Sequence, residues 1–255
     1  MAASRLTLQK PSPPAFEPVQ VTLGRTVEEA PGIKSFFLDY DKAQFSYKPG
    51  QLARLYVETG QDQLIFHSFS IASSPTEKFL LFTTQIRPES AYKHFLEKLT
   101  PGSRLFVRGP VGRFLLPEDP SNTILLLGGG IGITPFRSIV KFATDKRLAH
   151  KITLLYSNET PEEIVYRREW GELEERNPNL KVVHTITRPE RSKEKWNGRV
   201  GGIDEALILE HLKDPSKTLF YVCGTPSMVT NMTNLLRRMG IDSSRIMLES
   251  FPGYS

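Results

Sequence analysis

Two glycine-containing turns, each placed directly after an apolar run, stand out in this chain. Residues 128–136, GGGIGITPF, follow the apolar run 123–127, and residues 223–228, CGTPSM, follow the apolar run 219–222. Glycines let a backbone approach a pyrophosphate closely, and a helix that starts near Pro135 directs its free N–H groups at such an anion. Either turn alone also fits an ordinary strand-to-helix connection. The pair together favours a nicotinamide dinucleotide site.

The composition limits the other chemistry that this chain can carry out. Cys223 is the only cysteine and the five histidines are scattered, so the sequence predicts no disulfide, no cysteine-ligated cluster and no protein metal site. The net charge of +5 favours phosphate-bearing cofactors or an acidic redox partner, and no nucleic-acid motif occurs. No apolar stretch approaches the roughly 20 residues that span a bilayer, and no apolar signal core follows Met1, so we expect a cytoplasmic protein.

The chain divides into two halves with different patterns. Short apolar or alternating runs over residues 19–116, separated by Pro-Gly turns, predict an antiparallel barrel or sandwich with one helix after Ser90. From residue 121 onward, strands alternate with helical segments, one of them expected over residues 161–176, which predicts a parallel doubly wound sheet. We therefore expect a flexible lead-in over residues 1–15, a barrel domain over 16–118 and an α/β domain with the C-terminal tail over 119–255.

Two further strings occur in the barrel half, upstream of the glycine turns. They are residues 67–75, HSFSIASSP, and residues 85–93, QIRPESAYK. In this order, the four strings resemble the ferredoxin–NADP reductase superfamily, which includes ferredoxin reductases, cytochrome b5 reductase and flavin reductases. The resemblance covers nearly the whole chain from Phe16. It implies an enzyme, an NAD(P)H-dependent flavoprotein reductase, with an FAD-binding Greek-key β-barrel followed by a Rossmann-like NAD(P)H-binding domain.

The resemblance implies an FAD site at positions where this chain departs from the family pattern. The family segment is usually Arg-x-Tyr-Ser/Thr, in which the arginine binds the FAD pyrophosphate and the tyrosine packs against the isoalloxazine. Here His67 and Phe69 replace them, which implies looser flavin retention or FMN in place of FAD. We expect Arg87 to supply the missing charge, with a solvated surface arginine as the alternative. The implied FAD-binding residues are His67, Ser68, Phe69, Ser70, Gln85, Ile86, Arg87, Ser90, Ala91, Tyr92, Phe251 and Tyr254.

Three residues are implied to act near the reacting atoms. Ser70 would lie near flavin N5, Cys223 would help to align nicotinamide C4, and Glu249 would share a proton relay with Ser70, as the matching glutamate does in plant-type members. A small buried hydrophobe is the alternative for Cys223. Phe251, and after it Tyr254, is the candidate for the aromatic lid over the flavin face that receives the nicotinamide. The alternative is that these aromatics anchor the C-terminal tail.

The same resemblance implies the residues that bind NAD(P)H. Thr187 and Arg188 fall where NADPH-using relatives carry Ser-Arg, and Arg191 is nearby, which favours cationic contacts to a 2′-phosphate. Residues 157–164, SNETPEEI, instead resemble the matching loop of NADH-using cytochrome b5 reductases, so NADPH is preferred only slightly. The implied residues are Gly129, Gly130, Ile131, Gly132, Thr134, Pro135, Ser157, Asn158, Thr187, Arg188, Arg191, Cys223, Gly224 and Met228.

From these residues we expect an FAD-dependent oxidoreductase that takes a hydride from NAD(P)H and passes electrons to an external acceptor. The acceptor must be external because the sequence holds no cysteine set for an iron–sulfur centre. An acidic ferredoxin, flavodoxin or cytochrome would suit a basic reductase. Two alternatives stay open: an NAD(P)H:flavin or quinone reductase with a small diffusible acceptor, and a non-catalytic nucleotide-binding or electron-transfer subunit.

Overall fold

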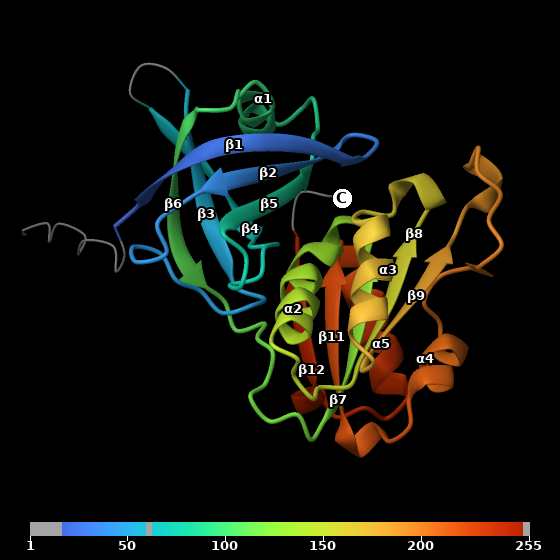
Figure 1. Cartoon of the computed structure of the whole chain (residues 1–255). Helices are drawn as coiled ribbons and strands as arrows, with labels where there is room; N and C mark the ends of the chain where they lie inside the picture. The colour runs from blue at the N-terminus through green and yellow to red at the C-terminus, as the bar shows by residue number, and fades with distance from the viewer. Residues whose placement is uncertain (1–16, 60–62, 252–255) are drawn as a thin grey trace, which may run out of the picture.

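The structure, a computed structural model, describes residues 17–59 and 63–251. Each half of the chain forms its own six-stranded sheet, and the barrel lies above the α/β domain in the view of Figure 1. The expected antiparallel N-terminal barrel and parallel C-terminal α/β domain are confirmed. Among the described residues, none of the helices has both the length and the apolar character that a membrane crossing requires.

The N-terminal sheet closes around a core of its own. Its elements are β1 (Val19–Ala30), β2 (Ile33–Asp39), β3 (Leu52–Glu58), β4 (Leu64–Ser70), β5 (Phe79–Gln85), α1 (Ala91–Glu97) and β6 (Arg104–Val111). The strands lie in the order β4-β3-β6-β1-β2-β5, and the edge strands β4 and β5 also contact each other. Alternate side chains point inward, so Ala53, Leu55 and Val57 of β3 are fully buried.

The C-terminal sheet is parallel and has helices on both faces. Its strands are β7 (Thr123–Gly129), β8 (Ile152–Asn158), β9 (Leu180–Ile186), β10 (Arg199–Val200), β11 (Thr218–Gly224) and β12 (Ile246–Ser250), in the order β10-β9-β8-β7-β11-β12. Its helices are α2 (Thr134–Asp145), α3 (Arg167–Arg176), α4 (Glu205–His211) and α5 (Pro226–Arg238). Phe136 of α2 and Trp170 of α3 belong to the core on one face, and Leu207 of α4 and Met232 of α5 to the core on the other.

The expectation of one helix over residues 161–176 is wrong. These residues form a short 3₁₀ turn, η2 (Pro161–Glu163), and then the separate helix α3. Between them, Ile164 and Val165 are fully buried, and Tyr166 has a left-handed φ of 59°. Burial of these apolar side chains overrides the helical pattern, because tertiary packing outweighs local propensity.

The two domains share an apolar cluster where they meet. Leu81 of the barrel belongs to the same core as the residues of α2, and the ring of Phe114 stacks 5.7 Å from that of Phe136. The first sheet ends at Val111 and the second begins at Thr123, so the connection between the domains runs through residues 112–122. The boundary at residue 118 stays a prediction that falls within this connection.

Candidate functional site

Two clefts meet where the carboxyl ends of the parallel strands face the barrel. The first, of about 350 Å³, lies between β4 and the end of β12, and the second, of about 550 Å³, extends over the ends of β7, β8 and β9. Ile131 lines both clefts, so they adjoin. The first is lined by Leu52, Phe66, His67, Ser68, Phe69, Ser70, Thr83, Ile131, Thr134, Glu249, Ser250 and Phe251. The second is lined by Gln85, Arg87, Gly129, Gly130, Ile131, Ser157, Asn158, Glu159, Glu163, Thr187, Gly202, Ile203, Thr225, Ser227, Met228, Asn231 and Met232.

Strand β4 supplies an aromatic wall to the first cleft. His67 and Ser68 are exposed along it, whereas Phe69 and Ser70 are buried at its inner end. The ring centroids of His67 and Phe69 lie 5.7 Å apart, and both residues line the cleft. These faces suit contact with a planar ring, since aromatic groups pack through offset or tilted stacking.

The cationic groups near this wall differ in protonation. Burial, and then the charge of Lys93, lowers the pKa of His67, so the imidazole is mostly uncharged at neutral pH and is a weak partner for phosphate. Lys93 is itself buried, and burial together with Arg87 lowers its pKa to about 8, against the opposing effect of Glu89. Lys93 therefore adds positive charge near His67. Sequence reasoning missed it because a lysine on a short helix resembles an ordinary surface residue.

Arg87 lines the second cleft rather than the first. It lies there with Gln85 and Gly130, and its Nη2 donates to Gln85 Oε1 at 3.4 Å. Ile86, between them, packs against the barrel core. The role of Arg87 at the FAD phosphates stays a prediction, and its position also brings it next to the glycine turn of the other domain.

Helix α1 begins as the sequence predicts, with Ser90 as its N-cap. The Ser90 hydroxyl accepts a hydrogen bond from the Lys93 N–H at 3.4 Å, and Ala91 and Tyr92 form the first turn. The Tyr92 side chain points into the barrel, where its hydroxyl donates to Leu55 O at 2.9 Å. Any contact of Ala91 and Tyr92 with phosphate would therefore use their backbone N–H groups, and that contact stays a prediction.

A hydrogen bond between the domains lies in the wall of the first cleft. Ser70 Oγ donates to Glu249 Oε1. Burial raises the pKa of Glu249 to about 7, and the bond from Ser70 opposes the rise. In the sheet, Glu249 pairs with Cys223, which pairs with Gly128 on its other side, so these residues form one row. A carboxyl group that titrates near neutrality can both give and take a proton at physiological pH.

The two glycine turns pack directly against each other. A Cβ atom at Gly129 would lie 2.3 Å from Met228 Sδ, and one at Gly132 would lie 2.4 Å from Cys223 O. Gly130 has a positive φ of 50°, which favours glycine. Packing against the Cys223 backbone therefore requires glycine at position 132, whereas Gly129 and Gly130 line the second cleft. The turn runs into α2, whose first residues are Thr134 and Pro135.

Cys223 borders the site from inside the sheet. Its side chain is fully buried, and burial, followed by the charge of Glu249, raises the pKa of its thiol. Cys223 is not among the described residues that line either cleft. A role in aligning nicotinamide stays a prediction.

Next to the ends of β8 and β9, Glu159 lines the second cleft and pairs with two arginines. Asn158, Glu159 and Thr187 line the cleft there. Arg191 Nη1 donates to Glu159 Oε2 at 3.1 Å, and Arg188 Nε lies 3.7 Å from the same oxygen. Neither side-chain amide atom of Asn158, which is buried, makes a hydrogen bond within the described part of the chain. The two arginines predicted to bind a 2′-phosphate thus face Glu159.

Of the two candidate lid residues, Phe251 and Tyr254, the structure describes only Phe251. Phe251 lines the first cleft, and its N–H donates to Gly224 O at 3.2 Å. It is half-buried and packs against the core that both domains share. Tyr254 lies outside the described residues. The lid function of Phe251 stays a prediction.

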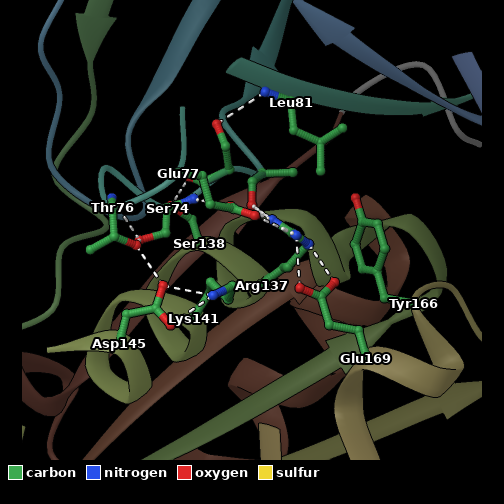
Figure 2. A network of polar contacts seen from close by, with 12 residues as sticks. Ser74, Thr76, Glu77, Leu81, Arg137, Ser138, Lys141, Asp145, Tyr166 and Glu169 are labelled. Carbon is green, nitrogen blue, oxygen red and sulfur yellow. Dashed lines mark hydrogen bonds and ion pairs between the residues drawn. The ribbon is translucent and has the colours of Figure 1, made fainter. Parts of the chain in front are cut away.

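A buried ion cluster, which sequence reasoning missed, joins the two domains (Figure 2). Arg137 of α2 is 5% exposed and donates to Ala72 O in the barrel half at 2.9 Å. Its guanidinium also donates to both oxygens of Glu77, at 2.9 and 3.0 Å, and to both oxygens of Glu169, each at 2.7 Å. Because Glu77 lies between β4 and β5 and Glu169 lies on α3, one guanidinium connects both domains.

Further hydrogen bonds extend this cluster along α2, as Figure 2 shows. Ser138 Oγ donates to Ser73 O at 2.6 Å, and Thr76 Oγ1 donates to Asp145 Oδ2 at 2.6 Å. The signal in the sequence is that Arg137 is the only charged residue in the first two turns of α2. Such a residue needs a buried partner, and its partners are distant in the sequence.

Comparisons with known proteins match both the sequence and the fold. Residues 126–234 match the sequence model of the oxidoreductase NAD-binding domain family. The glycine betaine monooxygenase reductase subunit of Chromohalobacter salexigens is 28% identical over 230 residues, covering 89% of this chain and 62% of that protein. A subunit of the Na⁺-translocating NADH-quinone reductase of Marinomonas sp. is 30% identical over 207 residues, covering 75% of this chain and 50% of that protein. The chain thus spans about half to three-fifths of the length of these relatives.

Solved structures share the fold over nearly the whole chain. The flavohem-like FAD/NAD-binding domain of nitric oxide dioxygenase from Vibrio cholerae has a TM-score of 0.79 at 19% identity, over 91% of this chain and 98% of that one. A ferredoxin NADP⁺ reductase from Neisseria gonorrhoeae, with bound FAD and NADP, has a TM-score of 0.77 at 22% identity, over 91% of this chain and 98% of that one. The chain thus has the two-domain fold of these FAD- and NAD(P)-binding structures, and its C-terminal half matches the oxidoreductase NAD-binding domain family.

Proposed function

We propose that this chain is an FAD-dependent oxidoreductase that takes a hydride from NAD(P)H and passes the electrons to an acceptor outside the chain. The observation that carries the proposal is the junction of the two clefts at Ile131. A flavin ring in the first cleft and a dinucleotide in the second would meet at that junction. Holding two reactants in contact is itself a large part of catalysis.

The described residues fit both cofactors. The first cleft joins the aromatic faces of Phe66 and Phe69 to the hydroxyl of Ser70, which suits a planar ring with a polar edge. In the second cleft, the glycine turn presents open backbone immediately before α2, which suits a pyrophosphate. The unsatisfied amide of Asn158 suits a polar group of the ligand, since buried amides normally find partners.

The residues of this chain would position the cofactors and manage a proton. FAD, when bound, supplies the chemistry that accepts a hydride and releases electrons one or two at a time. Ser70 would lie near flavin N5, with Glu249 behind it to hold or give up a proton at Oε1. Phe251 would keep water from the first cleft until the nicotinamide takes its place, and Cys223 would support that position from within the sheet.

The acceptor that we propose is a separate carrier protein such as a ferredoxin, a flavodoxin or a cytochrome. The net charge of +5 suits an acidic partner. Two similar proteins are named as reductase subunits, one of a monooxygenase and one of an NADH-quinone reductase, which supports an acceptor in another polypeptide. The second name also favours a second candidate, a reductase whose acceptor is a quinone or another small diffusible molecule.

The visible absorption spectrum of the purified protein, followed by anaerobic addition of NADH or NADPH, tests the proposal. We expect the bands of oxidised flavin, bleached by at least one of the two nucleotides. A protein that stays colourless after reconstitution with FAD and shows no diaphorase activity would contradict it and support a non-catalytic nucleotide-binding subunit. Turnover with free flavin or quinone, and none with any carrier protein, would support the second candidate.

A further inference from the structure

Glu159 lies where the adenosine ribose of a dinucleotide is expected. In doubly wound sheets, the pyrophosphate binds after the first strand, and an acidic residue further along binds the 2′-hydroxyl of the ribose. β7 and the glycine turn provide the first of these features, and Glu159 directly follows β8, the next strand, and lines the second cleft. We propose that Glu159 makes this site select NADH, with its free adenosine 2′-hydroxyl, over NADPH. This inference rests on the proposed function of the second cleft.

The arginines that favoured NADPH in the sequence are engaged by Glu159. Arg191 donates to Glu159 Oε2 at 3.1 Å, and Arg188 lies 3.7 Å from the same oxygen. Of these three charged residues, only Glu159 lines the cleft. A 2′-phosphate that approached the guanidinium groups would have to displace this carboxylate and stay close to its negative charge. Like charges brought together in this way discriminate against a ligand.

Backbone hydrogen bonds hold the arrangement. The Arg188 N–H donates to Glu159 O at 2.8 Å, and the Thr187 N–H donates to Asn158 O at 3.0 Å. Further along, Glu162 Oε1 accepts from Ser192 Oγ at 2.9 Å, which ties the segment after Arg191 to the segment after β8. These hydrogen bonds hold the backbones of the two loops side by side, so Arg188 and Arg191 stay within reach of Glu159.

The exposure of these side chains sets the size of the effect. Those of Glu159, Arg188 and Arg191 are 53%, 49% and 57% exposed. Ion pairs in water are weak and screened, so the carboxylate does not form an absolute barrier to a phosphate. We expect a preference of about tenfold for the ligand without the 2′-phosphate, as like charges near a protein surface repel moderately.

Calorimetric titration with ADP-ribose and with 2′-phospho-ADP-ribose tests the inference, because the two ligands differ only in the 2′-phosphate. We expect the wild type to bind ADP-ribose about tenfold more tightly. Glu159→Gln keeps the shape of the side chain and removes its charge, so its affinity for 2′-phospho-ADP-ribose should rise and the preference should disappear or reverse. Glu190→Gln is the matched control, since Glu190 is exposed in the neighbouring loop and its replacement changes the net charge equally.

The outcomes separate the inference from the proposed function. If the wild type prefers 2′-phospho-ADP-ribose, or if Glu159→Gln keeps the preference of the wild type, Glu159 does not select the nucleotide and the inference is wrong. If neither ligand binds to folded wild-type protein, the second cleft is no dinucleotide site, and the proposed function falls together with the inference. Steady-state kinetics with a dye acceptor give a second measurement, in which Glu159→Gln should lower the KM for NADPH and Glu190→Gln should leave it as in the wild type.

Discussion

Two contacts between the barrel and the α/β domain use partly buried carboxyl groups, and they differ in the group that faces the carboxylate. In the first, Arg137 lies between Glu77 and Glu169 and donates to both oxygens of each (Figure 2). In the second, Glu249 accepts a hydrogen bond from the neutral hydroxyl of Ser70. The first contact therefore carries compensating charge inside the protein, and the second does not.

The difference in partner gives the two carboxyl groups different properties. Burial raises the pKa of Glu169, but the charge and hydrogen bonds of Arg137 oppose this rise. Burial also raises the pKa of Glu249, and only the Ser70 hydroxyl opposes it, so the value reaches about 7. A buried carboxylate beside a guanidinium thus acts as a permanent tie between domains, and one beside a hydroxyl acts as a titratable group in the site.

The largest effect should come from Arg137→Met, which removes the cation and leaves two carboxylates buried. We expect the free energy of unfolding to fall by about 3–5 kcal/mol, since breaking a buried pair from one side leaves uncompensated charge. Urea unfolding followed by circular dichroism measures this loss. The pH dependence of any flavin-linked activity should stay as in the wild type, because Glu249 keeps its partner.

Two variants control for the removal of charge itself. Arg176→Met removes an exposed arginine that pairs with Asp145 at 3.0 Å, and we expect a loss below about 1 kcal/mol. Arg137→Met combined with Glu77→Gln and Glu169→Gln should recover part of the stability, because no unpaired charge is left. A loss for Arg137→Met as small as that for Arg176→Met would mean that the cluster does not tie the domains together.

The local features of this molecule could be predicted from its sequence. The strands of the parallel sheet are apolar runs, and the glycine turns follow them directly, so each is encoded within a few neighbouring residues. The helix expected over residues 161–176 was wrong for the opposite reason. Ile164 and Val165 leave the helical path because their positions in the core lie outside any short window of sequence.

The contacts between domains could not be derived from local pattern. Ser70 and Glu249 are 179 residues apart, and only the resemblance to a family brought them together before the structure did. No such resemblance pointed to Arg137, whose partners Glu77 and Glu169 lie in different domains. A buried arginine indicates that a partner exists, but the sequence does not say which carboxylate provides it.

Glu249→Gln should abolish the titration of the carboxyl group in the Ser70–Glu249 contact. With a pKa of about 7, Glu249 is protonated below neutrality and loses its proton above it. Under our proposal, the rate of the proton-dependent step in wild type falls as pH rises through 7, and the variant loses this inflection together with about a hundredfold of the rate. Stopped-flow measurements between pH 5.5 and 8.5 test this expectation.

The stability of the same variant provides an independent readout. The folded-state pKa of Glu249 lies above its ordinary value of 4.5, so the folded protein holds a proton that the unfolded chain has lost between these values. The free energy of unfolding of the wild type should therefore lose this contribution as pH rises from about 4.5 to about 7, and that of Glu249→Gln should not. An inflection near pH 7 that persists in the variant would assign it to another group.

Ser70→Ala should move the same inflection instead of removing it. The hydrogen bond from Ser70 stabilises the carboxylate form of Glu249, so its loss should raise the pKa further and shift the inflection above pH 7. We expect a loss of about 1 kcal/mol in the free energy of unfolding above that pH, where the charged oxygen has lost its donor. Ser70→Thr, which keeps the hydroxyl, should return the inflection toward its original position. An unchanged inflection in Ser70→Ala would separate the hydroxyl from the titration.

The smallest effect should come from Ser138→Ala, which removes a hydroxyl at the edge of the Arg137 cluster. Ser138 Oγ donates to Ser73 O at 2.6 Å, but Ser73 O also accepts from Tyr47 Oη at 3.1 Å, so it keeps a partner in the variant. We expect a loss of no more than about 1 kcal/mol in urea unfolding, because no buried group is left unsatisfied. The inflection near pH 7 should not move. If it did move, the two contacts would be coupled through the domain interface, and the distinction between a permanent tie and a titratable group would fail.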